Sequence, residues 1–286
     1  MIKPGPIDIV FLSGHIGAGK DSLAASMATG EGGGFLPLAF ADGLKRKLEE
    51  MNPLVKIEQD MSLGDNGFMR EVVCPLKEAL ARLNGWDNAK KQPFIRRLLQ
   101  AEGQSARSVY GRDVFCRPIA KQINIGIQAR GRSAESIQRP LRFVIKDTRQ
   151  LFEPAETLKL VDYPLSKLSV LMIWVDRAGT GPINDADSEL YYEGLYKMST
   201  GVIDNNWSLE KLDQKWVSWW NNMQENAYEY HMLCEATRIN IQSWTDMDPS
   251  MASKIEDQSN VCDMCKNHSN VGGGSVCKYC LRGDMR

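Results

Sequence analysis

Hydrophobic and polar residues follow two different periodicities along the chain. Short apolar runs rich in β-branched residues predict strands at residues 7–12, 141–145 and 168–175, with a very short one at 202–203. Amphipathic patterns with helical spacing predict helices at about 20–27, 41–51, 75–84, 94–102, 113–127, 153–160 and 208–234. Because strands that alternate with helices usually pair in parallel, the pattern predicts an α/β fold with a parallel sheet.

Two polar segments and one glycine-rich segment lack a regular pattern, while the last predicted helix has large side chains along one face. The glycine run 30–34 predicts a break in secondary structure, and residues 52–74 and 177–200 are polar and predict irregular chain. A stripe of large side chains in the last predicted helix indicates a surface that faces the core; it consists of Trp216, Trp219, Trp220, Met223 and Ala227. The predicted organisation is a large domain at residues 1–244, a polar linker at 245–260 and a small module at 261–286.

Composition places the chain among ordinary globular proteins. Of its 286 residues, 43% are hydrophobic and 25% are charged, and 35 basic against 36 acidic side chains give a formal charge of −1. No apolar run approaches the roughly 18 residues that a membrane span requires, and the first residues lack the plan of a secretory signal. We therefore expect a cytoplasmic protein without membrane contact. Its near-zero charge exerts no general attraction on nucleic acid.

The strongest motif is a glycine-rich loop between a predicted strand and a predicted helix. It reads Gly14-His15-Ile16-Gly17-Ala18-Gly19-Lys20-Asp21-Ser22. In this context the backbone N–H groups and the helix N-terminus can hold phosphates, and Lys20 can reach the β- and γ-phosphates. The residue after the lysine, usually a Ser or Thr that ligates Mg²⁺, is Asp21, so either Asp21 or Ser22 can take that role. The alternative is a glycine-rich turn that binds nothing.

Charged residues elsewhere can complete a phosphate site. Asp147 follows a predicted strand, and the carboxyl ends of parallel strands share one rim of a sheet with the phosphate loop. There Asp147 can hold Mg²⁺ through water or orient an attacking group, or it can simply end a strand. Guanidinium groups match phosphate oxygens two at a time. The candidate arginines are Arg96, Arg97, Arg112, Arg149 and Arg177, each of which can also belong to a solvated surface.

The last 25 residues contain two CxxC pairs, Cys262 with Cys265 and Cys277 with Cys280, separated by 11 residues. Four thiolates at this spacing can bind one tetrahedral structural Zn²⁺, and metal binding then supplies the folding energy of so short a segment. The alternative is a redox-active or disulfide-bonded pair. A small zinc ribbon can bind nucleic acid or protein, but four thiolates with one Zn²⁺ turn the slight positive charge of residues 254–286 into a slight negative one, which suits a phosphate backbone poorly.

Several motifs in a fixed order resemble the deoxynucleoside monophosphate kinases of tailed bacteriophages, a branch of the P-loop kinases. The matching segments are 11–22, 40–45, 96–100 with Gly103, 147–150 with Glu153 or Glu156, 175–179, Ser188-Glu189 and 203–210. They span roughly residues 7–220. The resemblance implies a three-layer α/β/α kinase fold, to which the C-terminal zinc ribbon is an addition.

The resemblance also implies an activity and residue roles. The activity is ATP- and Mg²⁺-dependent transfer of the γ-phosphoryl group to a deoxynucleoside monophosphate. The glycine loop and Lys20 would hold the donor phosphates, while Arg96 or Arg97 together with Arg149 would bind the acceptor phosphate. Asp42 and Lys45 would lie near the acceptor nucleotide. Arg177 would belong to a closing lid, which excludes water and so favours transfer over hydrolysis.

Other functions stay open at the level of sequence. A related kinase could phosphorylate a hydroxymethylated pyrimidine within DNA, with the zinc ribbon presenting the DNA, although the charge of the chain argues against it. The chain could instead be a non-enzymatic nucleotide-binding scaffold, or a small-molecule kinase such as a dephospho-coenzyme A kinase. A protein partner of the zinc module and a homodimer are compatible with the sequence. If a phage encodes the chain, its location would be the host cytoplasm.

Overall fold

The computed structural model describes four stretches of the chain: residues 6–60, 69–130, 140–181 and 192–245. These residues form two compact units. The sheet unit is built from the described parts of residues 4–37, 139–155 and 164–286, and the helix–hairpin unit from those of residues 38–138 and 156–163. The hydrophobic pattern of the sequence does not mark this division, because the helix–hairpin unit interrupts the sheet unit between two of its strands.

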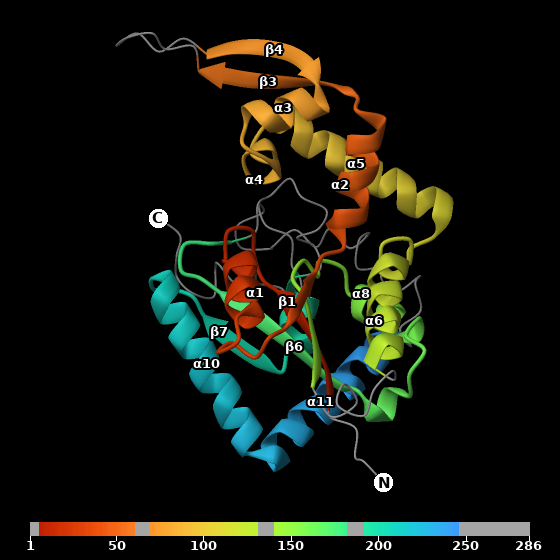
Figure 1. The fold of residues 1–286 in the computed structure, drawn as a ribbon, viewed down its shortest axis with the longest axis vertical. Helices are drawn as coiled ribbons and strands as arrows, with labels where there is room; N and C mark the ends of the chain where they lie inside the picture. The colour runs from red at the N-terminus through yellow and green to blue at the C-terminus, as the bar shows by residue number, and fades with distance from the viewer. Residues whose placement is uncertain (1–5, 61–68, 131–139, 182–191, 246–286) are drawn as a thin grey trace, which may run out of the picture. The chain divides into compact units, whose positions relative to one another are not determined.

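A five-stranded sheet with the strand order β2-β5-β1-β6-β7 forms the centre of the sheet unit. The strands are β1 (Ile7–Ser13), β2 (Leu36–Leu38), β5 (Leu141–Ile145), β6 (Ser169–Asp176) and β7 (Gly201–Asp204). β1 pairs in parallel with both β5 and β6, and β6 pairs in parallel with β7. Helices flank the sheet (Figure 1), which confirms the predicted α/β class with a mostly parallel sheet.

The main hydrophobic core lies between one face of this sheet and helices α1 (Lys20–Ala28) and α10 (Leu209–Glu225). Successive side chains of a strand point to opposite faces, so Val10 and Leu12 of β1 both face this core. Trp216, Trp220 and Met223 of α10 are buried and Trp219 is half-buried, which confirms this part of the core-facing stripe. Ala227, the last residue of the predicted stripe, is exposed and begins the next helix. The Trp216 indole also donates a 2.7 Å hydrogen bond to the Gly32 carbonyl, in the glycine run that the sequence predicts to be irregular.

The long helix predicted at 208–234 is wrong as a single helix. Ser208 caps its start as predicted, because its hydroxyl accepts a hydrogen bond from the Lys211 amide at 3.3 Å. The helix ends at Asn226, whose side-chain oxygen accepts from the Glu229 amide at 3.2 Å and so begins a second helix, α11 (Ala227–Thr245). Asparagine side chains compete with helical backbone hydrogen bonds in this way. α11 packs against β6 and α9 (Tyr192–Met198), a helix that lies where irregular chain was expected.

The helix–hairpin unit corrects two more predictions. The stretch expected to be irregular contains an antiparallel hairpin of β3 (Leu54–Asp60) and β4 (Met69–Pro75), in which Lys56 pairs with Glu71 at 2.6 Å. Its remaining elements are α2 (Ala41–Met51), α3 (Leu76–Arg82), α4 (Trp86–Ala89), α5 (Pro93–Tyr110), α6 (Cys116–Arg130) and the C-terminal part of α8 (Glu153–Lys159). α5 continues through the buried Gly103, where a break was expected, because a single glycine in a helix interior costs only about 1 kcal/mol and packing of the helix can outweigh it.

None of the helices that the structure describes is long and apolar enough to cross a membrane. The zinc module predicted at residues 261–286, and Ser188 and Glu189 of the resemblance, lie outside the described residues. The boundaries predicted at residues 244 and 260 stay predictions, since the last residue that the structure describes is Thr245, at the end of α11.

Candidate phosphate-binding site

The glycine-rich loop connects the end of β1 at Ser13 with the start of α1 at Lys20. Gly14 adopts φ +143°, and a Cβ atom at this position would lie 2.3 Å from the carbonyl oxygen of Val175 on β6. Gly17 and Gly19 also have positive φ, at +80° and +93°. The loop therefore follows a path that only glycine allows at Gly14, directly against the backbone of the neighbouring strand.

Asn205, just beyond the last residue of β7, contacts the same loop. It is buried, its side-chain amide donates to the Ala18 carbonyl at 2.7 Å, and its backbone amide donates to the Asp176 carbonyl at 2.7 Å. A Cβ atom on Gly19 would lie only 2.0 Å from Nδ2, the side-chain amide nitrogen of Asn205. Sequence reasoning gave Asn205 no role of its own, although a polar residue after a parallel strand on the loop side of the sheet is the signal that could have found it.

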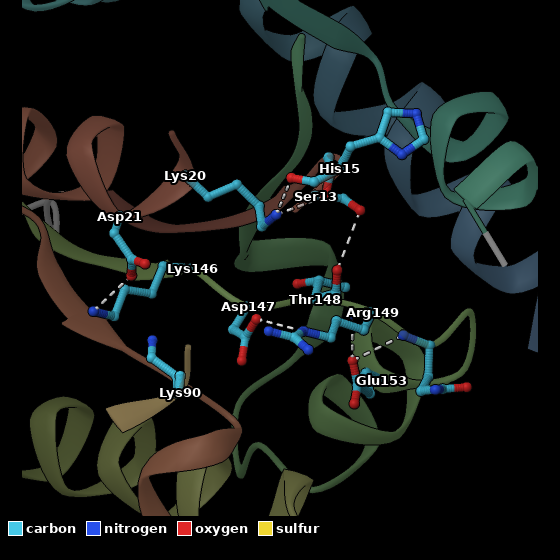
Figure 2. A network of polar contacts seen from close by, with 12 residues as sticks. Ser13, His15, Lys20, Asp21, Lys90, Lys146, Asp147, Thr148, Arg149 and Glu153 are labelled. Carbon is cyan, nitrogen blue, oxygen red and sulfur yellow. Dashed lines mark hydrogen bonds and ion pairs between the residues drawn. The ribbon is translucent and has the colours of Figure 1, made fainter. Parts of the chain in front are cut away.

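The ammonium group of Lys20 turns back onto its own loop. Its Nζ donates to the carbonyl oxygens of Gly14 at 2.6 Å and His15 at 2.9 Å (Figure 2). The lysine is therefore held over the loop, and the N-terminus of α1 adds partial positive charge at the same place. A phosphate in the loop would offer this ammonium stronger, charged acceptors than the two carbonyl oxygens.

The turn after β5 brings a carboxylate and a guanidinium to the loop side of the sheet. The Nε of Arg149 donates to Oδ1 of Asp147 at 2.7 Å, and the buried Glu153 carboxylate accepts from the backbone amides of Arg149 and Gln150 at 2.8 and 3.0 Å. The Ser13 hydroxyl at the end of β1 donates to the Thr148 carbonyl at 3.2 Å. These contacts fix the turn against the start of the phosphate loop (Figure 2).

Electrostatics within this turn favour a permanently charged Arg149. The Asp147 carboxylate is the largest cause that raises the pKa of Arg149 above its usual value, and burial opposes it. The Arg149 side chain nevertheless stays 42% exposed, against 19% for Asp147. Arg149 thus offers an anchored guanidinium that can still form a two-point contact with a phosphate.

Asp21, at the second position of α1, forms an ion pair with Lys146, the residue after β5. The distance from Nζ to Oδ1 is 3.0 Å. Mg²⁺ prefers oxygen ligands and in nucleotide sites takes one or two carboxylates together with substrate phosphates. Asp21, Ser22 and Asp147 provide such oxygens on the loop side of the sheet, so their chemistry fits the predicted metal. No group of three or more His, Cys, Asp or Glu residues forms a complete metal site within the described stretches.

Arg177 follows the end of β6 and reaches back to the loop. Its Nη1 lies 3.4 Å from the Gly17 carbonyl oxygen, at the limit of hydrogen bonding, and its own carbonyl accepts from the Thr180 hydroxyl at 2.7 Å. The structure thus brings Arg177 together with the phosphate loop, as it does Asp147 and Arg149. The predicted lid beyond it falls largely on residues that the structure does not describe.

Four predicted acceptor residues lie in the helix–hairpin unit. Asp42 and Lys45 are both on α2 and form an ion pair at 3.4 Å, while Arg96 and Arg97 are on α5, the first half-buried and the second exposed. α2 and α5 pack against each other within the unit. Arg112, also in this unit, pairs with Glu156. A role for these residues beside the phosphate loop stays a prediction.

The chain matches no protein-family model and no curated protein sequence. The geometry of the loop and of the residues around it is therefore the basis for a proposal about function.

Proposed function

We propose that this chain is an ATP-dependent kinase that transfers the γ-phosphoryl group to a deoxynucleoside monophosphate and forms the diphosphate. The observation that carries the proposal is the geometry of the loop. Three glycines with positive φ lie in the loop, the Lys20 ammonium turns back onto its carbonyl oxygens, and α1 begins directly after it. Backbone N–H groups and a lysine arranged in this way suit a chain of phosphates better than any neutral ligand.

In the proposed reaction an oxygen of the acceptor phosphate attacks the γ-phosphorus of ATP. The bond between this phosphorus and the β–γ bridging oxygen breaks, and ADP leaves with that oxygen. The attacking phosphate oxygen is already ionised at neutral pH, so the step needs no general base. Catalysis of this kind is mainly positioning and charge stabilisation. Lys20 would bind the β- and γ-phosphates of ATP. Arg177 would add positive charge beside Gly17.

Arg149 would bind the acceptor phosphate, and Asp147 would hold its guanidinium in place. The 2.7 Å contact between them and the two backbone hydrogen bonds from the Arg149–Gln150 turn to Glu153 support this role. Mg²⁺, when bound with ATP, would neutralise charge on the β- and γ-phosphates. Asp21 or Ser22 would be its ligand from α1, and Asp147 could contribute through water.

The resemblance to phage deoxynucleoside monophosphate kinases supports the choice of acceptor. Asp42, Lys45, Arg96 and Arg97 are the residues proposed to bind the acceptor nucleotide, on helices α2 and α5 of one unit. A structural Zn²⁺ on Cys262, Cys265, Cys277 and Cys280 is part of the same proposal. The module that they form would bind a protein partner or stabilise the enzyme, rather than bind DNA.

An acceptor screen tests this function. The protein is incubated with ATP and Mg²⁺ and separately with each of the four deoxynucleoside monophosphates, their ribose counterparts and DNA that contains hydroxymethylated pyrimidines. Chromatography then measures diphosphate and modified DNA. We expect diphosphate from at least one deoxynucleotide. Phosphate transferred only to DNA would favour the polymer-acting alternative, and transfer to no acceptor by a folded, ATP-binding protein would favour a scaffold.

A further inference from the structure

The ion pair between Asp21 and Lys146 occupies an unusual position. Asp21 directly follows the loop lysine, at the place from which P-loop proteins provide a ligand for the divalent cation. Lys146 directly follows strand β5, and its Nζ lies 3.0 Å from Oδ1 of Asp21. The lysine side chain is 30% exposed and the aspartate side chain 71% exposed. The Lys146 ammonium thus contacts one oxygen of the Asp21 carboxylate, which is well placed to bind a metal ion.

Asp21 and Asp147 each have an internal cation. Lys146 pairs with Asp21 from β5, and the adjacent Asp147 pairs with Arg149 at 2.7 Å (Figure 2). The two pairs differ in one respect. The Arg149 pair is formed within a single turn that Glu153 also fixes, whereas the Lys146 pair connects β5 with α1 through two flexible side chains. The Lys146 pair, in which the Asp21 side chain is 71% exposed, is the one that can open at low cost.

An ammonium group and a divalent cation compete for one carboxylate oxygen. Mg²⁺ loses water reluctantly and usually binds proteins through one or two carboxylates plus substrate phosphates. A lysine that already neutralises Asp21 must move before the metal can use the contacted oxygen. The free-energy cost of that movement subtracts from the affinity of the metal in the nucleotide complex.

We propose that Lys146 is an internal counterion of Asp21 that the divalent cation of the nucleotide displaces, so that Lys146 sets the metal concentration the protein requires. The inference rests on the proposed function, because it needs a nucleotide in the loop. It makes Lys146 a positioning residue that acts through Asp21. It also assigns Asp21, rather than Ser22, as the metal ligand from α1.

The test measures how strongly metal and nucleotide binding are coupled. Calorimetry determines the Kd of a non-hydrolysable ATP analogue once in EDTA and once with saturating Mg²⁺, and the ratio of the two values is the coupling. For Lys146→Met we expect a coupling about two- to fivefold larger than in the original protein, as an exposed ion pair would allow. Lys146→Arg, which keeps a cation for Asp21, should restore the original ratio. Lys146→Gln replaces the Met variant if that protein does not fold.

Two further variants make the result specific. Asp21→Asn should reduce the coupling, and adding Lys146→Met to it should then change nothing, because the lysine acts only through this carboxylate. Lys215→Met is a matched control, since Lys215 pairs with Asp204 at 3.1 Å and is 32% exposed. If Lys146→Met changes the coupling equally with and without Asp21→Asn, the inference is overturned. It is also overturned if Lys146→Met changes the coupling no more than Lys215→Met does. Either result leaves the kinase proposal intact. No nucleotide binding in either condition would refute the proposed function and this inference with it.

Discussion

The side-chain amide of Asn205 donates a 2.7 Å hydrogen bond to the carbonyl oxygen of Ala18 and so connects the end of β7 with the phosphate loop. Both partners are buried, and the same asparagine lies against Gly19. The loop is therefore positioned from three strands: β1, where it begins, β6, which contacts Gly14, and β7 through Asn205. Its shape therefore depends on contacts with several strands of the sheet.

Replacing Asn205 with alanine should damage the loop more than the fold. The change leaves the buried Ala18 carbonyl without its partner, which costs about 1–3 kcal/mol. We expect a lower midpoint of thermal unfolding and about tenfold weaker ATP binding, measured by calorimetry on the folded variant. Asn124→Ala is the control, because Asn124 makes a comparable set of amide hydrogen bonds in the helix–hairpin unit. Equal losses of ATP affinity in both variants would contradict a specific role for Asn205.

Gly14→Ala should strongly destabilise the protein. Its Cβ would approach the Val175 carbonyl oxygen to 2.3 Å in a backbone conformation that L-residues rarely adopt. Strain and overpacking together should cost about 3 kcal/mol of unfolding free energy, measured by denaturant titration. Gly30→Ala is the matched comparison, since no atom lies within 4 Å of its added Cβ. We expect that variant to be as stable as the original protein or slightly more stable.

Arg149→Lys keeps the charge but removes the planar fork that matches a phosphate. We expect the KM for the acceptor nucleotide to rise about tenfold or more, with a much smaller change in the Kd for ATP. Arg177→Lys is the useful comparison, because Arg177 lies beside Gly17 in the donor loop. A larger effect of Arg149→Lys on ATP affinity than on the acceptor KM would reverse the proposed assignment of the two arginines.

Cys234 should be unreactive in the folded protein. Burial is the main cause that raises the pKa of its thiol to about 11, and nearby Asp8 adds to the shift. At pH 8 almost none of it is thiolate, the form that reacts with alkylating reagents. Mass spectrometry after brief iodoacetamide treatment should find Cys234 unlabelled in the native protein and labelled in denaturant. Rapid native labelling would show that α11 opens readily from β6.

The sequence predicts the elements that carry a strong local pattern. β1, β5 and β6 coincide with short apolar runs, and α2 has clear amphipathic spacing, so the structure places them close to their predicted bounds. The hairpin of β3 and β4 is missed because a charged pair such as Lys56 and Glu71 makes its exposed face look like polar loop. The alternation that buries Val55 and Ile57 was the available signal.

Tertiary contacts explain the other differences. Gly103 resembles a helix end in sequence, but it is buried inside α5, where packing against α2 and β3 outweighs the roughly 1 kcal/mol cost of one glycine. At the site, the glycine loop could be predicted because its chemistry is contiguous in sequence. Asn205 and Lys146 were given no role, since their contacts with Ala18 and Asp21 form only when distant strands meet on one rim of the sheet. For Asn205 the position after a parallel strand was an available signal.

The most direct test of the account follows the γ-phosphoryl group itself. ATP labelled with ³²P at the γ-position is mixed with the protein, Mg²⁺ and the acceptor found in the screen. We predict that the label appears in the β-phosphate of the deoxynucleoside diphosphate, at a rate that Lys20→Ala reduces at least about 100-fold without loss of folding. Label found only as free phosphate, or transfer that survives unchanged in Lys20→Ala, would show that this chain is not a nucleotide kinase that uses Lys20.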